Sequence, residues 1–427
     1  MSLLVGLAFF LFALLGVPLA FAMGLAALVG LLNGQLPLNM LAEKMFFSVD
    51  SFPLMSIPFF MLAGDLMVRG GIIRELVSVA DSIVGHIRGG MAQSTVLAGF
   101  GLATVSGTAV ADAAALSSAL NKSMCRLYSV PFSSAVIGAS ANLGPIIPPS
   151  TPMIIYATLA GGSVTIPALF AAGVIPGLII AAGMMMIIAI TARVRGYPAS
   201  GQQFSLVRVV KTMLRSAVVL LMPVIIIGGI LGGAFTSTEG GAIAVVYAFV
   251  VGMFVKRELR WSHLPGALLN AVVTTAVVGA LIAFASTVTF LFTVDMLPVK
   301  LSDTLRGLTD DPTMVLFLMM LLMMIVGMFI EPSSAYVMFV PILIPLCASF
   351  GVDPLHFAMI FILTLIVGML TPPVGTLLFV MCGINRISLW ALSRELTPYI
   401  ILQQVVVVLI LFFPALVLWL PKALGLS

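Results

Sequence analysis

Of the 427 residues, 61% are apolar and only 8% are charged, whereas a soluble domain carries about 25% charged residues. This composition excludes a soluble globular protein. The apolar residues form long uncharged runs, such as those between Ser2 and Leu32 and between Arg215 and Glu239. At roughly 20 apolar residues per span, we expect an all-α polytopic membrane protein with about ten transmembrane helices. The net charge of +4 gives no reason to expect nucleic-acid binding, because basic residues in membrane proteins mainly report orientation.

Most basic residues gather in five short stretches that hold 15 of the 19 Lys and Arg residues. These stretches are 69–88, 122–126, 193–215, 256–260 and 386–394. The segments 43–50 and 295–311 are acidic instead. The positive-inside rule therefore places the basic stretches in the cytoplasm and the two acidic segments outside.

Two segments must enter and leave the membrane on one side. The segment 91–120 lies between two cytoplasmic stretches, is too short for two spans, and is interrupted at residues 106–108. It therefore predicts a re-entrant helical hairpin. By the same reasoning, 312–350 forms a hairpin from the outside that turns near Glu331. The two hairpins face each other from opposite leaflets.

Other breaks and short helices follow from the same pattern. The segment 2–36 should hold two short helices broken near Gly16-Val17-Pro18, because one helix of that length would overshoot the hydrocarbon core. The second half should break near residues 236–241. Segments 71–88 and 295–311 mix charged and apolar residues at helical spacing, which predicts helices lying in the membrane interface.

An internal repeat relates the two halves. Pro148-Pro149 and Pro372-Pro373 lie 224 residues apart, and near this offset residues 107–110 map onto 331–334. Since the two hairpins enter from opposite sides, the repeats are inverted, a pattern typical of secondary transporters. The predicted organisation is a first repeat, 1–212, with hairpin 91–120 and broken helix 131–160, and a second, 213–427, with hairpin 312–350 and broken helix 352–382.

The breaks and hairpin tips supply oxygen ligands at one depth. A Pro-Pro pair removes backbone donors and leaves carbonyls free, and free carbonyls beside helix ends can hold ions. Hard oxygen ligands suit Na⁺ better than a transition metal. The predicted Na⁺ ligands are Ser106, Gly107, Thr108, Asp112, Asn142 and Gly144, with Ser140 nearby, and in the second half Gly327, Glu331, Ser333, Thr371 and Gly375. Alternatively, the Ser and Thr residues only cap the broken helix ends.

Four acidic residues lie at or near membrane depth, and such carboxylates are candidates for function. Asp65 precedes Arg69 by four residues, so a structural ion pair is expected. Asp112 and Glu331 lie at the hairpin tips, where we favour orientation of the tips over ion ligation. Glu239 marks a helix break outside the hairpins and should be structural. The isolated cysteines and histidines form no metal-binding or catalytic motif.

At these residues the chain resembles the large membrane subunit of tripartite ATP-independent periplasmic (TRAP) transporters, of the DctM type, within the ion transporter superfamily. The resemblance covers essentially the whole chain. Its specific strings are Ser106-Gly-Thr-Ala-Val-Ala-Asp-Ala-Ala-Ala-Leu and Gly144-Pro-Ile-Ile-Pro-Pro-Ser-Thr-Pro-Met-Ile-Ile-Tyr, and its weaker ones are Gly16-Val-Pro-Leu-Ala-Phe-Ala, Phe235-Thr-Ser-Thr-Glu and Thr371-Pro-Pro-Val-Gly. Thr108 stands where family members often have Ser, and the hydroxyl is retained.

The resemblance implies an elevator transporter of the bacterial inner membrane, with a scaffold domain and a mobile domain that contains both hairpins and both broken helices. It implies Na⁺-driven uptake of an organic acid, such as a C4-dicarboxylate, sialic acid or sugar acid. A periplasmic binding protein would deliver the substrate, and a small four-helix membrane subunit, expected as a separate chain, would complete the permease. An anionic substrate would bind at the tips and breaks, at Ser106, Thr108, Asn142, Ser333, Ser334 and Thr371.

Three other hypotheses about the function stay open at this point. A divalent-anion/Na⁺ symporter would share the hairpins but work without a periplasmic partner. An intramembrane enzyme would need a convergent catalytic set, and Asp112 with Glu331 is the only pair that the repeat brings together, so we expect no enzyme. A passive channel would lack saturable, Na⁺-coupled flux.

Overall fold

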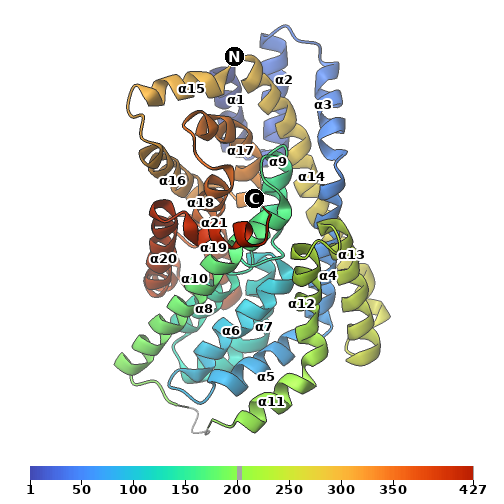
Figure 1. The fold of residues 1–427 in the computed structure, drawn as a ribbon, viewed down its shortest axis with the longest axis vertical. Coiled ribbons are helices and arrows are strands. Elements are labelled where there is room, and N and C mark those ends of the chain that lie inside the picture. The colour runs from blue at the N-terminus through green and yellow to red at the C-terminus, as the bar shows by residue number, and fades with distance from the viewer. Residues whose placement is uncertain (200–203, 427) are drawn as a thin grey trace.

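The computed structural model describes residues 1–199 and 204–426, and its regular structure in these ranges is helical apart from one isolated bridge between Arg88 and Ala199. The helices of the first half are α1 (Ser2–Leu14), α2 (Leu19–Asn33), α3 (Asn39–Val49), the 3-10 helix η1 (Phe52–Met55), α4 (Ser56–Arg69), α5 (Ile72–Val84), α6 (Gly90–Ser106), α7 (Ala109–Leu127), α8 (Val130–Ala141), α9 (Thr151–Leu159) and α10 (Ile166–Val194). Figure 1 shows their arrangement.

The second half contains the same kinds of helices. They are α11 (Leu206–Arg215), α12 (Ala217–Leu231), α13 (Ser237–Val250), the π-helix η2 (Val251–Val255), the 3-10 helix η3 (Trp261–His263), α14 (Leu264–Val294), α15 (Leu297–Arg306), α16 (Pro312–Phe329), α17 (Pro332–Ser349), α18 (Pro354–Gly368), α19 (Thr376–Asn385), α20 (Leu389–Phe412) and α21 (Ala415–Ala423). The predicted boundary between the repeats at residue 212 falls inside α11.

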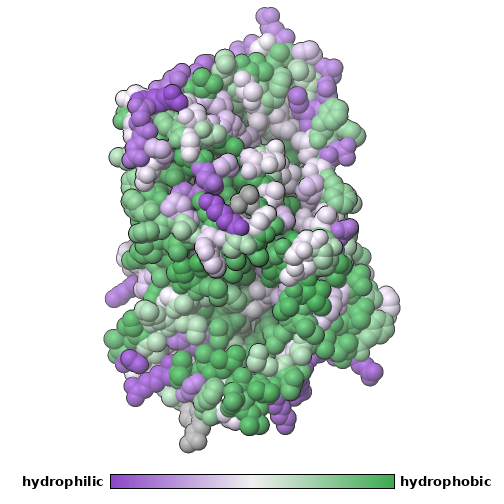
Figure 2. Space-filling model, viewed as in Figure 1, coloured by the Kyte–Doolittle hydropathy of each residue, from purple (hydrophilic) through white to green (hydrophobic). Residues whose placement is uncertain are grey.

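Among the described residues, seven helices are long and apolar enough to cross a membrane, or eight if the bent pair α11 and α12 forms one span. Five further apolar helices have only 10–17 residues. These short helices explain why fewer full-length spans occur than the ten expected from composition, because several apolar runs are broken in the middle. Apolar side chains cover much of the middle of the surface, and hydrophilic side chains gather mainly toward the two ends of the long axis (Figure 2).

The breaks outside the hairpins have local causes. The chain breaks between α1 and α2 at residues 15–18, as predicted, where Gly16 has a φ of +83° and Pro18 cannot donate a backbone hydrogen bond. The corresponding break in the second half lies at residues 232–236. There Thr236 and Glu239 form a capping box at the start of α13, which confirms a structural role for Glu239.

The two halves pack in a crossed pattern. Helix α6 packs on α8 and α16 packs on α18, whereas α7 packs on α19 and α17 packs on α9. The second helix of each hairpin, α7 or α17, thus contacts a helix from the other half, whereas the first helix, α6 or α16, packs within its own half. At the centre, the side-chain amide of Asn142 donates to the carbonyl of Ile366, the residue 224 positions later, at 3.1 Å. A second group of helices, α2, α3, α4, α13 and α14, packs together beside this core (Figure 1).

Two short helices that the sequence places in the interface are α5 and α15, and each is held by a carboxylate. On α5, Glu75 accepts hydrogen bonds from Lys256 at 2.5 Å and Ser216 at 2.6 Å. Before α15, Asp295 accepts from the backbone and hydroxyl of Ser2 and pairs with Lys300. These contacts tie both short helices to neighbours that are distant in the sequence.

The Glu75 contacts also affect its ionisation. Burial raises the pKa of Glu75, but hydrogen bonds from Lys256 and Ser216 and the positive charge of Lys256 outweigh burial and leave the pKa below its usual range. The contribution of Glu75 to stability is therefore present above the pKa that it has in the unfolded chain. It is lost as the pH falls through the lowered pKa of the folded state.

We expect Glu75→Gln to reduce the free energy of unfolding by about 1–3 kcal/mol at neutral pH, because a partly buried charge-assisted pair is removed. Thermal unfolding of the purified chain measures this effect. The matched control is Arg74→Gln, because Arg74 pairs with Glu258 at 3.5 Å at a site where the Arg74 side chain is 79% exposed. The control should change stability by less than about 1 kcal/mol. Equal effects of the two variants would contradict the anchoring role of Glu75.

Candidate functional site

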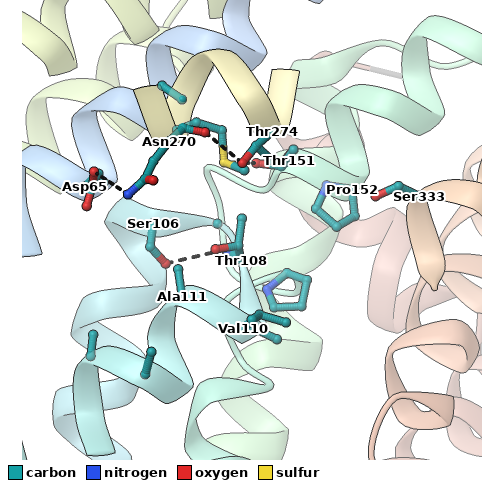
Figure 3. Close-up of a pocket in the computed structure, with 18 of the residues that line it drawn as sticks. Asp65, Ser106, Thr108, Val110, Ala111, Thr151, Pro152, Asn270, Thr274 and Ser333 are labelled. Carbon is teal, nitrogen blue, oxygen red and sulfur yellow. Dashed lines mark hydrogen bonds between the residues drawn. The ribbon is translucent and has the colours of Figure 1, made fainter. Parts of the chain in front are cut away.

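A cavity of 660 Å³ lies between the hairpin tips and a wall formed by α4 and α14. The first tip, residues 106–108, joins α6 to α7, and the second tip, residues 331–334, begins α17. Both tips contribute side chains to the cavity (Figure 3). The cavity thus joins segments that lie more than 200 residues apart in the sequence.

The first tip packs directly on the first break, residues 142–150. Gly107 has a φ of +63°, and a Cβ added there would lie 2.6 Å from the carbonyl oxygen of Pro149. Glycine is therefore required for both the turn and the close approach. The first break contains a cis Pro148-Pro149 bond, and the Ser150 hydroxyl donates to the Pro145 carbonyl at 2.6 Å.

Asp112 lies behind the first tip, one turn into α7, and is completely buried. One carboxylate oxygen accepts a hydrogen bond from the hydroxyl of Ser106. The other, Oδ2, has no hydrogen-bond partner among the described residues. A Cβ added at Gly144 would lie 2.5 Å from this oxygen and 3.1 Å from the Thr108 carbonyl oxygen. Asp112 Oδ2 and the Thr108 carbonyl thus approach the same point on the first break.

The second tip is organised by Glu331. Its carboxylate accepts from the Ser334 backbone N–H at 3.2 Å and from the Ser333 hydroxyl at 2.9 Å, so it caps the start of α17. The first tip differs, because no side chain caps the first backbone N–H groups of α7. These N–H groups, at a positive helix end, are available to an anion in the cavity.

The second break, residues 369–375, packs on the second hairpin through glycines. A Cβ added at Gly327 would lie 3.0 Å from the Leu365 carbonyl oxygen, and one at Gly368 would lie 2.5 Å from the Gly327 carbonyl carbon. Gly375 donates its backbone N–H to the carbonyl of Met328 at 2.9 Å. The Thr371 hydroxyl donates back to the end of α18, to the Val367 carbonyl at 2.8 Å.

Asn142 is completely buried away from the cavity, at the crossing of the two halves. Besides the Ile366 carbonyl, its side-chain nitrogen donates to Gln403 at 2.8 Å. Its oxygen Oδ1 has no hydrogen-bond partner among the described residues. The nitrogen of Asn142 therefore serves packing between the halves, and only its oxygen is available to a ligand.

The structure thus separates the predicted site residues into two sets. Those that line the cavity are Ser106, Gly107, Thr108, Glu331 and Ser333. Those that are buried outside its lining are Asp112, Asn142, Gly144, Gly327, Ser334, Thr371 and Gly375, together with Ser140. The first set surrounds space for a substrate, and the second lies at the breaks behind it.

The opposite wall carries polar residues that sequence reasoning passed over or placed elsewhere. Asp65 accepts from Arg69 at 3.1 Å, as expected, and also from Asn270 of α14 at 3.3 Å (Figure 3). Asn270 and Thr274 line the cavity from α14. In the sequence, an amide and a hydroxyl within a long apolar span are the only features that could have indicated these two residues. Among the described lining residues, two are carboxylates, Asp65 and Glu331, and none is Lys, Arg or His.

Comparison with known proteins places the chain in a family. The family model for the tripartite ATP-independent periplasmic transporter, DctM component, matches residues 6–416. The C4-dicarboxylate TRAP transporter large permease protein DctM of Pseudomonas aeruginosa is 36% identical over 388 residues, which cover 91% of this chain and 90% of the relative. The sialic acid TRAP transporter large permease protein SiaM of Vibrio cholerae is 35% identical, with 95% of each chain covered.

A solved structure shares the fold. The crystal structure of the YdaH transporter of Alcanivorax borkumensis matches with a TM-score of 0.61 at 17% identity, covering 88% of this chain and 89% of that one. The family model and the two relatives cover nearly the whole chain, including both tips and both breaks. The chain therefore belongs to the DctM component family of TRAP transporters, and it is a transporter subunit and not an enzyme.

Proposed function

We propose that this chain is the large permease subunit of a Na⁺-coupled importer of an organic acid in a bacterial inner membrane. A soluble periplasmic binding protein delivers the acid, and a small membrane subunit completes the permease. The names of the two relatives, which specify C4-dicarboxylates and sialic acid, support an organic acid as the substrate. All the predicted substrates carry at least one carboxylate.

One observation supports coupling to a cation most strongly. The cavity is bordered by the helix starts of α7 and α17 but has carboxylates and no basic side chain among its described lining residues. An organic anion in such a cavity gains from the uncapped N–H groups of α7 and is repelled by Glu331. Cations bound at the breaks would offset this repulsion, so that acid and Na⁺ bind together.

The first cation site of this proposal lies behind the first tip. Its ligands are Asp112 Oδ2, the Thr108 carbonyl and the backbone near Gly144, which approach one point. A buried carboxylate without a full set of partners is destabilising by several kcal/mol unless a cation or a proton neutralises it. The Ser106 hydroxyl holds the other oxygen of Asp112, so the same residue would orient the tip and ligate Na⁺.

The second cation site lies by symmetry at the second break. Its candidate ligands are carbonyls near Gly327 and Gly375 and the Thr371 hydroxyl oxygen, which keeps a free lone pair while it donates to Val367. Glu331 already accepts from Ser333 and Ser334. We therefore assign Glu331 to tip orientation, and we do not make it a ligand.

The proposal includes movement of the hairpin core past the α4 and α14 wall. A Cβ added at Gly64 of α4 would lie 3.1 Å from Ser106 Cα, so glycine lets the first tip pass close to the wall. Ala111, Ala114 and Ser118, on one face of α7, line the cavity and are exposed. This face runs from the tip toward the predicted cytoplasmic end of α7, which supports an inward-facing state.

We expect Na⁺-dependent uptake in proteoliposomes that contain this chain, its small subunit and its binding protein. An inward Na⁺ gradient should drive accumulation of the acid. Replacement of Na⁺ by K⁺ should abolish accumulation, because no Lys, Arg or His among the described lining residues can offset the negative charges. Equal rates in the two salts would contradict the proposal. Uptake that does not need the binding protein would support the divalent-anion symporter instead.

We expect Gly144→Ala to reduce Na⁺-driven uptake about tenfold or more and to raise the half-maximal Na⁺ concentration. The added methyl group meets the carboxylate of Asp112 and backbone atoms of Thr108, and overpacking of this kind is destabilising by about 1–3 kcal/mol. The control is Gly383→Ala in α19, where a Cβ meets nothing within 4 Å. Unchanged Na⁺ dependence in Gly144→Ala would exclude this point as a cation site.

We expect Ser118→Cys, in a chain whose native cysteines are replaced, to react with a membrane-impermeant thiol reagent from the cytoplasmic side only. Inverted and right-side-out vesicles separate the two sides. The control is Ser163→Cys in the loop before α10, which the charge pattern places outside and which is exposed. Labelling of Ser118→Cys from the outside alone would reverse the proposed orientation of the cavity.

A further inference from the structure

Helix α11 lies at one end of the molecule, beside α5, and belongs to neither hairpin (Figure 1). It is bent by 69° from α12, which continues the chain as an apolar helix after Ser216. A helix that turns sharply where an apolar helix begins is positioned at the level of the lipid headgroups. Its ten residues were not predicted as an interfacial helix from the sequence.

The apolar side chains of α11 are largely exposed instead of packed. Leu206 is 66% exposed, Val207 77% and Leu214 72%, whereas Val209 is buried. At 100° per residue, the exposed residues share one side of the helix, and Val209 lies on a different side. An exposed apolar side on a helix that packs against the protein on another side is typical of helices in the membrane interface.

Basic residues run along a second stripe of α11. Arg208, Lys211 and Arg215 are exposed and spaced three and four residues apart, which places them on one face. The segment 193–215 contains five basic residues and no Asp or Glu. Of these, Arg195 pairs with Glu395 at 2.9 Å, and the charge of Arg215 acts on Glu75.

We propose that α11 binds the phosphate headgroups of anionic phospholipids through its exposed basic stripe, Arg208, Lys211 and Arg215, with its apolar side inserted among the acyl chains. The basic stripe supplies the complementary charge, and Leu206, Val207 and Leu214 supply the apolar contact. A bilayer matches this helix better than a protein partner does. Because α11 lies beside the apolar helix α12, its apolar side can contact the acyl chains while its basic stripe contacts the headgroups.

The lipid site connects to a hairpin through α5. Helix α11 packs on α5, and Ser216, which follows α11, donates to Glu75 of α5 at 2.6 Å. Helix α5 in turn packs on α6, the first arm of the first hairpin. Anionic lipid bound to α11 therefore stabilises α5, the helix on which the first hairpin packs. The inference does not require the proposed function, because lipid binding is measured without transport.

The test uses the purified full chain in nanodiscs of phosphatidylcholine with an increasing fraction of phosphatidylglycerol. The unfolding temperature should rise with phosphatidylglycerol and reach a plateau. Arg208→Gln together with Lys211→Gln should require a much higher fraction for half of this rise, about fivefold for each charge removed. Lys122→Gln, at an exposed lysine of α7, should respond as the unmodified chain does.

A second pair of variants tests the apolar side. Val207→Ser with Leu214→Ser removes only exposed side chains, so it should leave the fold intact in detergent while weakening the response to phosphatidylglycerol. An unchanged response in both double variants would overturn the proposal. So would an equal stabilisation by phosphatidylcholine alone or by free glycerol phosphate. The double variants can also be coexpressed with the small subunit. If they no longer copurify with it but keep the lipid response, α11 is a protein interface instead.

Discussion

The structure depends on the need to pair every backbone polar group inside a bilayer, where water cannot serve as the partner. Two apolar helices break at Pro-Pro pairs, and each break is supported by neighbouring backbone. Gly107 lets the first tip pack on residues 142–150, and Gly375 donates to the carbonyl of Met328 beside residues 369–375. Asn142 then joins the first break to α18, the helix that precedes the second break, by donating to Ile366. The breaks are stable because helices of the two halves pack against each other. The same packing brings both tips to one cavity.

Much of the fold could be predicted because breaks in apolar runs and the placement of charges are local features of a sequence. The two helices in residues 2–36, the structural role of Glu239 and the pair of Asp65 with Arg69 follow from such features, and the structure confirms them. Composition does not show how the apolar runs divide into helices, and among the described residues seven long apolar helices occur beside five shorter ones. The sequence analysis did not predict α11 as an interfacial helix. Its apolar residues alternate with basic ones, and the stretch served only as a marker of the cytoplasmic side.

The site was less predictable, because it depends on contacts between distant segments. Sequence spacing brought the tip and break residues together as one group, whereas the structure separates cavity-lining Ser106, Thr108 and Ser333 from buried Asp112 and Asn142. The direction of a side chain decides this division, and spacing alone does not give it. Asn270 could not be placed, because its partner Asp65 is 205 residues away.

In the proposed mechanism, Na⁺ and the organic acid bind together, because an anion in a cavity lined by carboxylates needs cations nearby. Thermodynamic linkage requires that each ligand raise the affinity for the other by the same factor. The most direct measurement is binding of radioactive Na⁺ to the purified chain with its small subunit, in the presence and absence of the transported acid. We expect saturable Na⁺ binding that the acid strengthens. Na⁺ binding that is absent, or that the acid leaves unchanged, would contradict it.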